Sequence, residues 1–533
     1  MGSTLTGYGG VGEIGGNAFL LDDGKTRLWL DFGKRFGGGS GAGWGDFFDE
    51  FLKPRTFRYV PDLMALGLVP PKPHLYRPDL GGMPGRPDAD AVVVSHAHMD
   101  HCGLLGLLKP QIPILASPES WAALSSIQET GVAVPEQEFT RTRARGLGRR
   151  KDGGVAKSGG GAEGPQRAVR LDAKVELGAW RLEHVPVDHS IHGSRATFVE
   201  GPDLHLAYTG DFRLHGRQKQ QSERFVERAG GVDVLVVEGT RVDGPGDHED
   251  HNSTDQESGV EGQVQEFIAA EERQSGRTGF VGIAYPPRDL DRFQSLLSVA
   301  RRSRRRLAIS PKQAHLLETL RMAGRDDLPD PRRDSALAIH FEASGKGLIL
   351  REAAKTVPMA QEDLSVGEHA VTEGEFRDLL AGDYRDKPWA HGYLDAPTRV
   401  TALDIGRDPG GFLFSINYWS ITELFDIFPD AARANGLYIH SQTQPFNDEM
   451  ELKDAKLMRW LDRFHLDRKD THVSGHLGEK DLEWVLDEVG ARTLVPVHTQ
   501  WAAYTAERYE ARTGLQATLP VAGKPMALGR PSL

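Results

Sequence analysis

Short apolar runs separated by glycine-rich turns dominate the first hundred residues. Leu5 to Tyr8, Asn17 to Leu21 and Arg27 to Asp31 have the length and composition of strands, and the turn GGVG follows the first of them. Residues 90–95, with the sequence DAVVVS, form a β-branched run too short for a helix. The pattern predicts a β-meander followed by a buried strand.

Similar apolar runs recur along the rest of the chain, and several are separated by segments with helical periodicity. Strands alternating with helices are typical of an α/β protein. The further predicted strands cover 181–187, 205–209, 232–237, 278–283, 307–309, 411–415, 472–474 and 493–497.

Composition narrows the class of protein. Hydrophobic residues make up 39% of the 533 residues and charged residues 26%, so the chain can bury a sizeable core. At roughly 150 residues per domain, this length predicts two or three domains. The formal net charge of −12 means that any binding of nucleic acid must use local basic patches or metal ions.

Cysteine content and hydropathy predict the compartment. The single cysteine, Cys102, excludes an internal disulfide and a cysteine-rich zinc module. No run approaches 18 apolar residues, and the first residues lack the pattern of a secretory signal. We therefore expect a cytoplasmic protein with no membrane partner.

Two polar segments look like insertions. Arg141 to Arg167 is rich in glycine and basic residues and predicts a mobile solvated loop, with contact to a polyanion as the alternative. Asp243 to Gln256 is acidic and polar and is expected to mark a domain junction. The role of residues 37–86 stays open.

The densest chemistry lies directly after the run DAVVVS. His96, His98, Asp100 and His101 place four side chains that can bind metal within six residues, at the end of a predicted buried strand. Buried histidines with purely structural roles usually occur singly. An extended segment would point His96 and His98 one way, with Asp100 and His101 at the following turn, and this split favours two adjacent metals over one.

Three more candidate ligands also end apolar runs. These are His189 in VDHS, Asp211 in YTGDF and His498 in PVHT. Two zinc ions need about eight ligands from protein and solvent. We expect one ion to be held by His96, His98 and His189 and the other by Asp100, His101 and His498, with Asp211 and a hydroxide bridging them.

The order of motifs GGVGEIGGN, LDFG, HAHMDHCG, VDHS, YTGDF, VEGT, VSGH and PVHT resembles that of the metallo-β-lactamase fold nucleases of the β-CASP family, such as ribonuclease J. The features that distinguish this family from other proteins of the same fold are Glu238 at a strand end, a long insertion, and then His476 and His498. The resemblance implies an α/β fold, a metallo-β-lactamase αββα sandwich with an inserted β-CASP domain. The implied boundaries are 1–239 and 471–533 for the sandwich and 240–470 for the insertion.

Residue roles follow from the same resemblance. Asp31 is expected to orient a ligand histidine. Asp100, Glu238 and His476 are expected to serve catalysis, with Glu238 charging a histidine that protonates the leaving oxygen. Ser441, Ser474 and Gly475 are expected to contact substrate. Two departures, Gln444 where glutamate is common and His192 where proline is common, affect the expected substrate contacts and not the metal site.

The implied activity is hydrolysis of single-stranded RNA, as a 5′-exonuclease, an endonuclease or both, by a hydroxide bridging two Zn²⁺ ions. Mn²⁺ in place of Zn²⁺, DNA in place of RNA, and a homodimer all stay open. Small-molecule hydrolases of the lactonase or thioesterase kind have no evident use for the long insertion, and a non-catalytic scaffold would have lost ligands. In the inserted domain, two alternatives stay open for each of two sets of residues. Tyr418 and Trp419 are expected to pack in the core or to stack on bases. Basic residues are expected to contact the RNA backbone or to form a solvated helix face: Arg288, Arg292, Arg301, Arg302, Arg304, Arg305 and Arg306.

Overall fold

The chain forms two compact units in the computed structural model. Unit 1 combines residues 1–248 with 475–533, and unit 2 comprises residues 249–474. The structure describes residues 2–37, 42–49, 51–149, 154–245, 253–275, 279–342, 356–360, 366–370, 378, 381–382, 384–385, 387–428, 430–431, 434–445 and 448–528.

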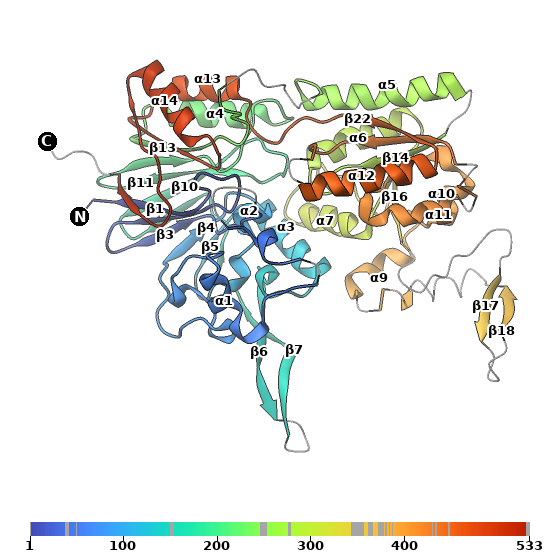
Figure 1. The fold of residues 1–533 in the computed structure, drawn as a ribbon, viewed down its shortest axis with the longest axis horizontal. Coiled ribbons are helices and arrows are strands. Elements are labelled where there is room, and N and C mark those ends of the chain that lie inside the picture. The colour runs from blue at the N-terminus through green and yellow to red at the C-terminus, as the bar shows by residue number, and fades with distance from the viewer. Residues whose placement is uncertain are drawn as a thin grey trace. The chain divides into compact units, whose positions relative to one another are not determined.

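Unit 1 contains two seven-stranded sheets (Figure 1). The first begins as the predicted antiparallel meander and continues with parallel strands. Its order is β25 (Pro525–Ala527), β1 (Thr4–Gly9), β2 (Ala18–Asp22), β3 (Arg27–Leu30), β4 (Ala91–Val93), β5 (Ile114–Leu115) and β8 (Val169–Arg170).

The second sheet combines segments from before and after unit 2. Strand β23 pairs in parallel with β13, so residues beyond the insertion lie inside this sheet. Its order is β24 (Gln516–Ala517), β23 (Thr493–Val497), β13 (Val234–Glu238), β12 (His205–Tyr208), β11 (Arg195–Glu200), β10 (Trp180–Pro186) and β9 (Lys174–Leu177).

The two sheets pack face to face. Leu21, Leu30 and Val93 of the first sheet share one buried core with Leu206 and Val236 of the second. Helices α4 (Lys219–Ala229), α13 (Glu479–Val489) and α14 (Ala502–Thr513) cover the outer face of the second sheet, and α1 (Tyr59–Ala65), α2 (Met99–Cys102) and α3 (Pro118–Thr130) lie on the side of the first (Figure 1). The predicted αββα sandwich is confirmed.

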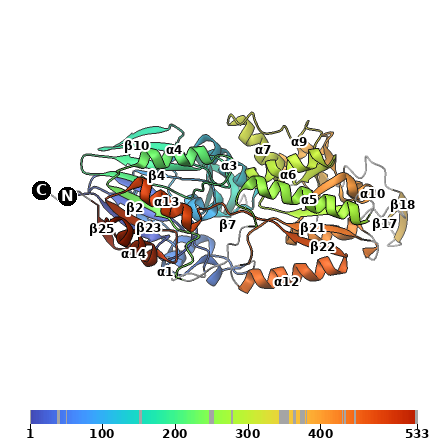
Figure 2. The same cartoon turned by 90° about the horizontal axis from the view of Figure 1, so that it is seen from above.

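Unit 2 is a parallel α/β sheet covered by helices on both faces. Its strand order is β19 (Arg399–Val400), β16 (Leu337–His340), β15 (Arg306–Ile309), β20 (Phe412–Ser415), β14 (Phe280–Ala284), β21 (Gly436–His440) and β22 (Leu466–Asp470). Helices α5 (Glu257–Ser275), α6 (Leu290–Arg302) and α7 (Pro311–Met322) lie on one face, and α12 (Asp448–Arg463) lies on the other (Figure 2). Smaller elements are α9 (Pro388–Leu394), α10 (Ala402–Arg407), α11 (Leu424–Ile427) and the two-stranded pair β17 (Thr356–Ala360) and β18 (Val366–Ala370).

Two predictions of local structure were wrong. Residues 472–474 are not a strand; the strand is β22, and the chain leaves the sheet after Asp470. The expected loop 141–167 contains an antiparallel hairpin of β6 (Arg141–Arg149) and β7 (Val155–Gln166). Its base is fixed by the buried Glu138, which accepts hydrogen bonds from Arg77 and Arg145 at 2.5 Å each. Glycine content concealed this hairpin because backbone pairing needs no large side chains.

Two of the arginines proposed as RNA contacts are buried inside unit 2, so the prediction was wrong for them. Arg292 is fully buried, and its guanidinium binds the carboxylate of Glu257 and the carbonyl oxygens of Ser441 and Val473. Arg305 is buried and donates to the carbonyl oxygens of Gly279 and Phe412. The charge of Arg292 and Arg305 in the sequence did not reveal that both side chains are buried and bind groups inside unit 2.

Among the described residues, no helix is both long and apolar enough to cross a bilayer.

We expect Arg292→Ala to lower the free energy of unfolding by about 3–5 kcal/mol, because it leaves the buried Glu257 carboxylate without its partner. Urea unfolding followed by circular dichroism would measure this. The control is Arg301→Ala. Loss of its exposed ion pair with Asp334 should lower the free energy of unfolding by less than about 1 kcal/mol. Unchanged stability in Arg292→Ala with weakened RNA binding would contradict the internal role.

Candidate metal centre

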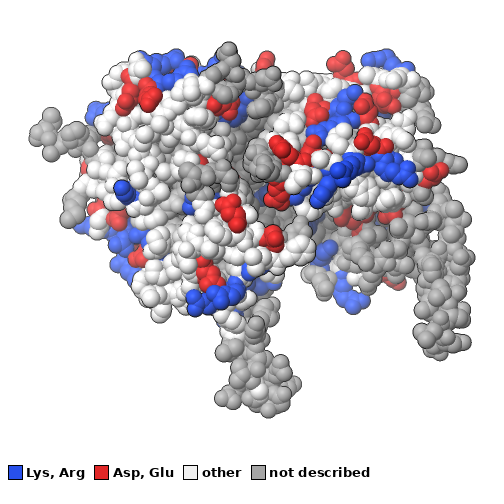
Figure 3. Space-filling model, in the orientation of Figure 1, with Lys and Arg blue, Asp and Glu red and all other residues white. Residues whose placement is uncertain are grey.

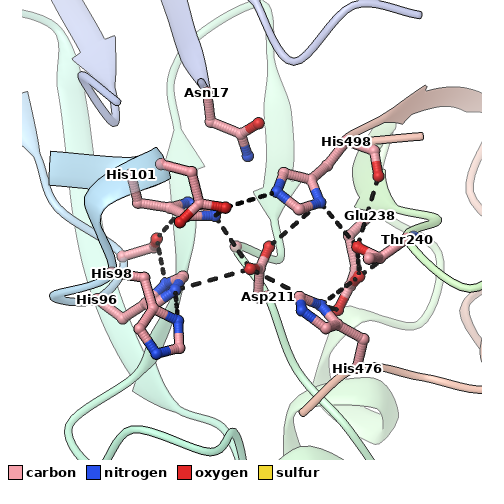
Figure 4. Close-up of polar contacts among 12 residues, drawn as sticks. Asn17, His96, His98, His101, Asp211, Glu238, Thr240, His476 and His498 are labelled. Carbon is pink, nitrogen blue, oxygen red and sulfur yellow. Dashed lines mark hydrogen bonds and ion pairs between the residues drawn. The ribbon is translucent and has the colours of Figure 1, made fainter. Parts of the chain in front are cut away.

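The candidate ligands of unit 1 follow the ends of strands, and Figure 4 shows His96, His98, His101 and His498 gathered around Asp211. His96 and His98 follow the buried strand β4, and α2 presents Asp100 and His101 one turn later. His189 follows β10, Asp211 follows β12 and His498 follows β23. Because β12, β13 and β23 are parallel neighbours, their carboxyl ends deliver side chains to the same place.

Backbone contacts from the first meander hold the ligand-bearing turn. The amides of Asn17 and Phe32 donate to the carbonyl oxygens of Asp100 and His101 at 2.8 Å. A Cβ atom at Gly33 would lie 1.6 Å from the Asp100 carbonyl oxygen, so only glycine allows this approach. The motifs GGN and LDFG therefore act on the site through the backbone.

One group of donors consists of three histidine nitrogens. Nδ1 of His98 lies 3.0 Å from Nε2 of His96 and 3.1 Å from Nε2 of His189. Nδ1 of His189 faces the carbonyl oxygen of Gly475 at 2.6 Å, so it carries the ring's proton and leaves Nε2 as a lone-pair donor. Burial, together with the neighbouring histidines, holds the pKa of His96 and His189 well below the ordinary value, so both are neutral and suited to a cation.

The second group of donors combines carboxylates with histidines. Nε2 of His101 lies 3.0 Å from Oδ2 of Asp211, and Nε2 of His498 lies 3.2 Å from Oδ2 of Asp100. Asp211 belongs to both groups: ligand atoms of His96, His98, His189 and Asp211 all lie within 4.8 Å of one another, and so do those of Asp100, His101, Asp211 and His498.

Asp211 is the electrostatic centre of the site. It is 1% exposed, and neither of its oxygens forms a hydrogen bond of good geometry with any described residue. Burial opposes its charge, yet His101, His498 and His476 bring the pKa of Asp211 well below the ordinary value. Burial also opposes protonation of His101, but Asp211, Asp100 and Asp31 raise the pKa of His101 well above its ordinary value. The cluster thus holds a proton on His101 where a divalent cation could take its place.

Asp31 organises the wall behind His101. Its Oδ2 atom lies 2.7 Å from His101 Nδ1 and accepts hydrogen bonds from the hydroxyls of Ser95 and Tyr208. Asn17 in turn donates to the Tyr208 hydroxyl. The backbone of Asp31 has a φ of 59°, a left-handed conformation that the surrounding structure has to stabilise.

Glu238 and His476 form a pair beside the two donor groups. Nδ1 of His476 lies 3.0 Å from Oε2 of Glu238. Burial would lower the pKa of His476, but Glu238 and Asp211 outweigh it and raise the pKa to about 9. The hydroxyl of Thr240 donates to Glu238 Oε2 and lies 2.7 Å from His498 Nδ1, so Thr240 connects this pair to the second donor group (Figure 4).

All seven residues expected to bind metal lie in the two donor groups, and Asp31, Glu238 and His476 adjoin them. The residues expected to contact substrate, Ser441, Ser474 and Gly475, do not belong to the two donor groups. Ser441 lies in unit 2, where it is fully buried and its hydroxyl donates to the carbonyl oxygen of Thr471. Ser474 is the last residue of unit 2. Gly475 supports His189, and a Cβ atom there would lie 3.1 Å from that ring.

The sequence interpretation missed Ser95, Tyr208 and Thr240. Ser95 directly precedes His96 in SHAH, and Thr240 lies two residues after Glu238 in VEGT, so their positions near predicted site residues were available signals. Tyr208 gave no signal, because a tyrosine in an apolar run predicts only core packing.

Comparisons with known proteins agree with this geometry. Residues 66–261 match the family model described as "Beta-lactamase superfamily domain". The chain is 22% identical over 528 residues to ribonuclease J of Sinorhizobium meliloti, which spans 96% of this chain and 71% of that protein. It also resembles the transcription termination factor FttA of Methanosarcina mazei (31% over 104 residues) and ribonuclease J of Helicobacter pylori (22% over 213 residues). These matches cover 20% and 39% of this chain but only 11% and 23% of those relatives.

A solved structure shares the whole fold. A protein of unknown function from Enterococcus faecalis V583 superposes with a TM-score of 0.65 at 20% identity, covering 99% of this chain and 100% of that one. The chain therefore carries a metallo-β-lactamase fold domain, and its resemblance to the β-CASP nucleases is confirmed. Its donor groups are suited to divalent metal.

We expect Asp31→Asn to weaken metal binding by about 10- to 100-fold, because the carboxylate that orients His101 is lost. Competition with a chromophoric chelator would measure the affinity. Glu200→Gln, which removes an exposed carboxylate on β11, is the matched control and should leave affinity unchanged. Wild-type affinity in Asp31→Asn would show that His101 needs no such support.

Proposed function

We propose that this chain, a metallo-β-lactamase fold protein similar to ribonuclease J, is a metal-dependent nuclease that hydrolyses phosphodiester bonds of single-stranded RNA, by 5′-exonucleolytic or endonucleolytic cleavage. The observation that carries the proposal is the combination of two donor groups sharing Asp211 with an adjacent acid pair, Glu238 and His476. Phosphodiester hydrolysis requires a nucleophile, charge compensation and a proton donor, and this combination can supply all three.

The donor chemistry suits two divalent cations. Neutral imidazoles with carboxylates are typical zinc ligands, and Mn²⁺ is an alternative. His96, His98 and His189 would hold one ion and Asp100, His101 and His498 the other, with Asp211 shared. The buried oxygens of Asp211 accept no hydrogen bond of good geometry from the described residues. Bound there, such cations would provide a hydroxide nucleophile near neutral pH and positive charge for the attacked phosphate.

His476 is the proposed proton donor. The Glu238 carboxylate accepts a hydrogen bond from Nδ1 of His476 and favours the charged imidazolium. Nε2 of His476 is then the nitrogen that delivers a proton to the leaving oxygen. The lost proton neutralises the developing alkoxide and prevents its recombination. His476 is only partly buried, with 22% of its side chain exposed, so a substrate atom can approach it.

The decisive experiment is metal analysis of the purified protein together with three cleavage assays, each with and without chelator. The substrates are a 5′-monophosphorylated single-stranded RNA, its DNA counterpart and a generic lactone. We expect about two metals per chain and chelator-sensitive RNA cleavage, with product lengths separating exonuclease from endonuclease. Turnover of the lactone alone would overturn the nuclease proposal, and cleavage of DNA alone would overturn the RNA assignment.

We expect His476→Ala to retain its metal but to lose kcat by roughly 10²-fold or more, because the leaving oxygen has no proton donor. Elemental analysis and single-turnover cleavage would measure the two quantities. His101→Ala is the contrasting variant and should lose metal and activity together. Full activity of metal-loaded His476→Ala would contradict its role as general acid.

We expect Glu238→Gln to shift the alkaline limb of the kcat/KM profile to lower pH. A general acid works in its protonated form, so activity falls as pH rises through its pKa, and Glu238 is the largest cause that raises the pKa of His476. Glu200→Gln should leave the profile unchanged. An unshifted alkaline limb in Glu238→Gln would show that another group sets it.

A further inference from the structure

Unit 2 contains a cavity of about 260 Å³ at the carboxyl ends of three central strands. Three residues at these strand ends line the cavity. Ala284 ends β14 and His440 ends β21, and Trp419 lies in a short 3₁₀ helix, Tyr418–Glu423, that follows β20. The chain continues from β14 toward β15 on one side and from β20 to β21 on the other, so the order of strands reverses here. Crevices at such reversals of a parallel sheet are the usual ligand sites of this architecture.

The lining offers flat aromatic surface at its mouth. Trp419 is 66% exposed, an unusual state for tryptophan, and lies 5.4 Å from Tyr418 with the rings at 75°. The backbone of Trp419 is fixed by a hydrogen bond to the side chain of Asn417. The backbone of Trp419 is therefore held in place while its ring remains open to solvent, so Trp419 does not pack in the core.

The inner lining contains an unused polar group. Tyr438 is fully buried, and its hydroxyl has no hydrogen-bond partner among the residues that the structure describes. Burial raises the pKa of Tyr438, so the hydroxyl remains protonated and able to donate. A buried hydroxyl without a partner is costly, and a ligand that reaches it would remove that cost.

The charges around the cavity are already paired. Lys453 binds Glu449 at 2.6 Å and lies over the Trp419 ring, and Asp454 accepts from Arg468 at 2.7 Å. A phosphate would find no uncommitted cation among the described lining residues. The cavity therefore favours a neutral planar group with polar edges over an anion.

A row of basic side chains begins beside the cavity. Helix α12 contributes Lys453 and Leu457 to the lining and continues with Lys456, Arg459 and Arg463. The last three are exposed and have no ion-pair partner among the described residues. Figure 3 shows Lys and Arg side chains gathered along the face where α12 runs in Figure 1. This row suits the phosphates of a strand whose base enters the cavity.

We propose that this cavity of unit 2 binds one base of single-stranded RNA, stacked on Trp419 and hydrogen-bonded to the Tyr438 hydroxyl, while the flanking phosphates lie along α12. The assignment rests on the proposed nuclease function, since it places part of the same substrate. It identifies a base-binding subsite built from neutral groups, separate from the metal centre of unit 1.

The test is an abasic scan with the full-length protein in chelator, which prevents cleavage. A fluorescent single-stranded RNA and a set of copies, each lacking one base, are titrated by anisotropy. For the wild type, we expect one position at which loss of the base weakens binding by about tenfold or more. Trp419→Ala and Tyr438→Phe should each weaken binding of the intact RNA and abolish the effect of that abasic position. Tyr438→Phe preserves the ring, so it tests the hydroxyl without disturbing the core.

Trp484→Ala, which removes a partly exposed tryptophan on α13 of unit 1, is the matched control and should bind like the wild type. Lys456→Gln with Arg459→Gln should weaken binding equally for every copy and reduce its dependence on salt. Wild-type binding and RNA cleavage combined with unchanged binding by Trp419→Ala and Tyr438→Phe would overturn the subsite alone. Absence of both binding and cleavage in the wild type would overturn the subsite together with the nuclease proposal.

Discussion

The buried carboxylate of Asp211 sets the constraint on which the centre of unit 1 depends. A charge removed from water has to be compensated, and here three histidines, His101, His498 and His476, supply the largest compensation. Histidines can give up their protons, unlike arginine, so the same arrangement serves a proton or a cation. Two further carboxylates position these histidines. Asp31 lies at Nδ1 of His101, and Glu238 lies at Nδ1 of His476.

This arrangement explains why the fold places its ligands at strand ends. Strands β4 and β13 are buried along their whole length, and β23 is buried at all but its first residue, so packing over both faces fixes their positions. The residues at or after their ends can turn inward to the site. The ligand turn of α2 lacks that support and is held instead by amides of the meander. Precision at the centre therefore derives from the two sheets rather than from the loops.

Much of the fold and of the candidate site could be predicted from the sequence, because burial at strand ends leaves a local pattern. DAVVVSHAH shows in nine residues both an apolar strand and the donors that follow it. Ties between distant residues leave no such pattern: the pairing of Arg292 with Glu257, 35 residues away, turned an expected surface cation into a buried one. The hairpin of β6 and β7 was concealed for a related reason, since backbone hydrogen bonds hold it together and the sequence shows only glycine and charge.

The position of β23 inside the second sheet has a consequence for the order in which the protein is made. His476 and His498 leave the ribosome only after the whole of unit 2, and until then β13 has β12 on one side but lacks β23 on the other. A growing chain that has released His96 through Asp211 still has an open sheet edge and an incomplete set of ligands. Any chemistry of the finished centre is thereby withheld until the segments on both sides of unit 2 have been made.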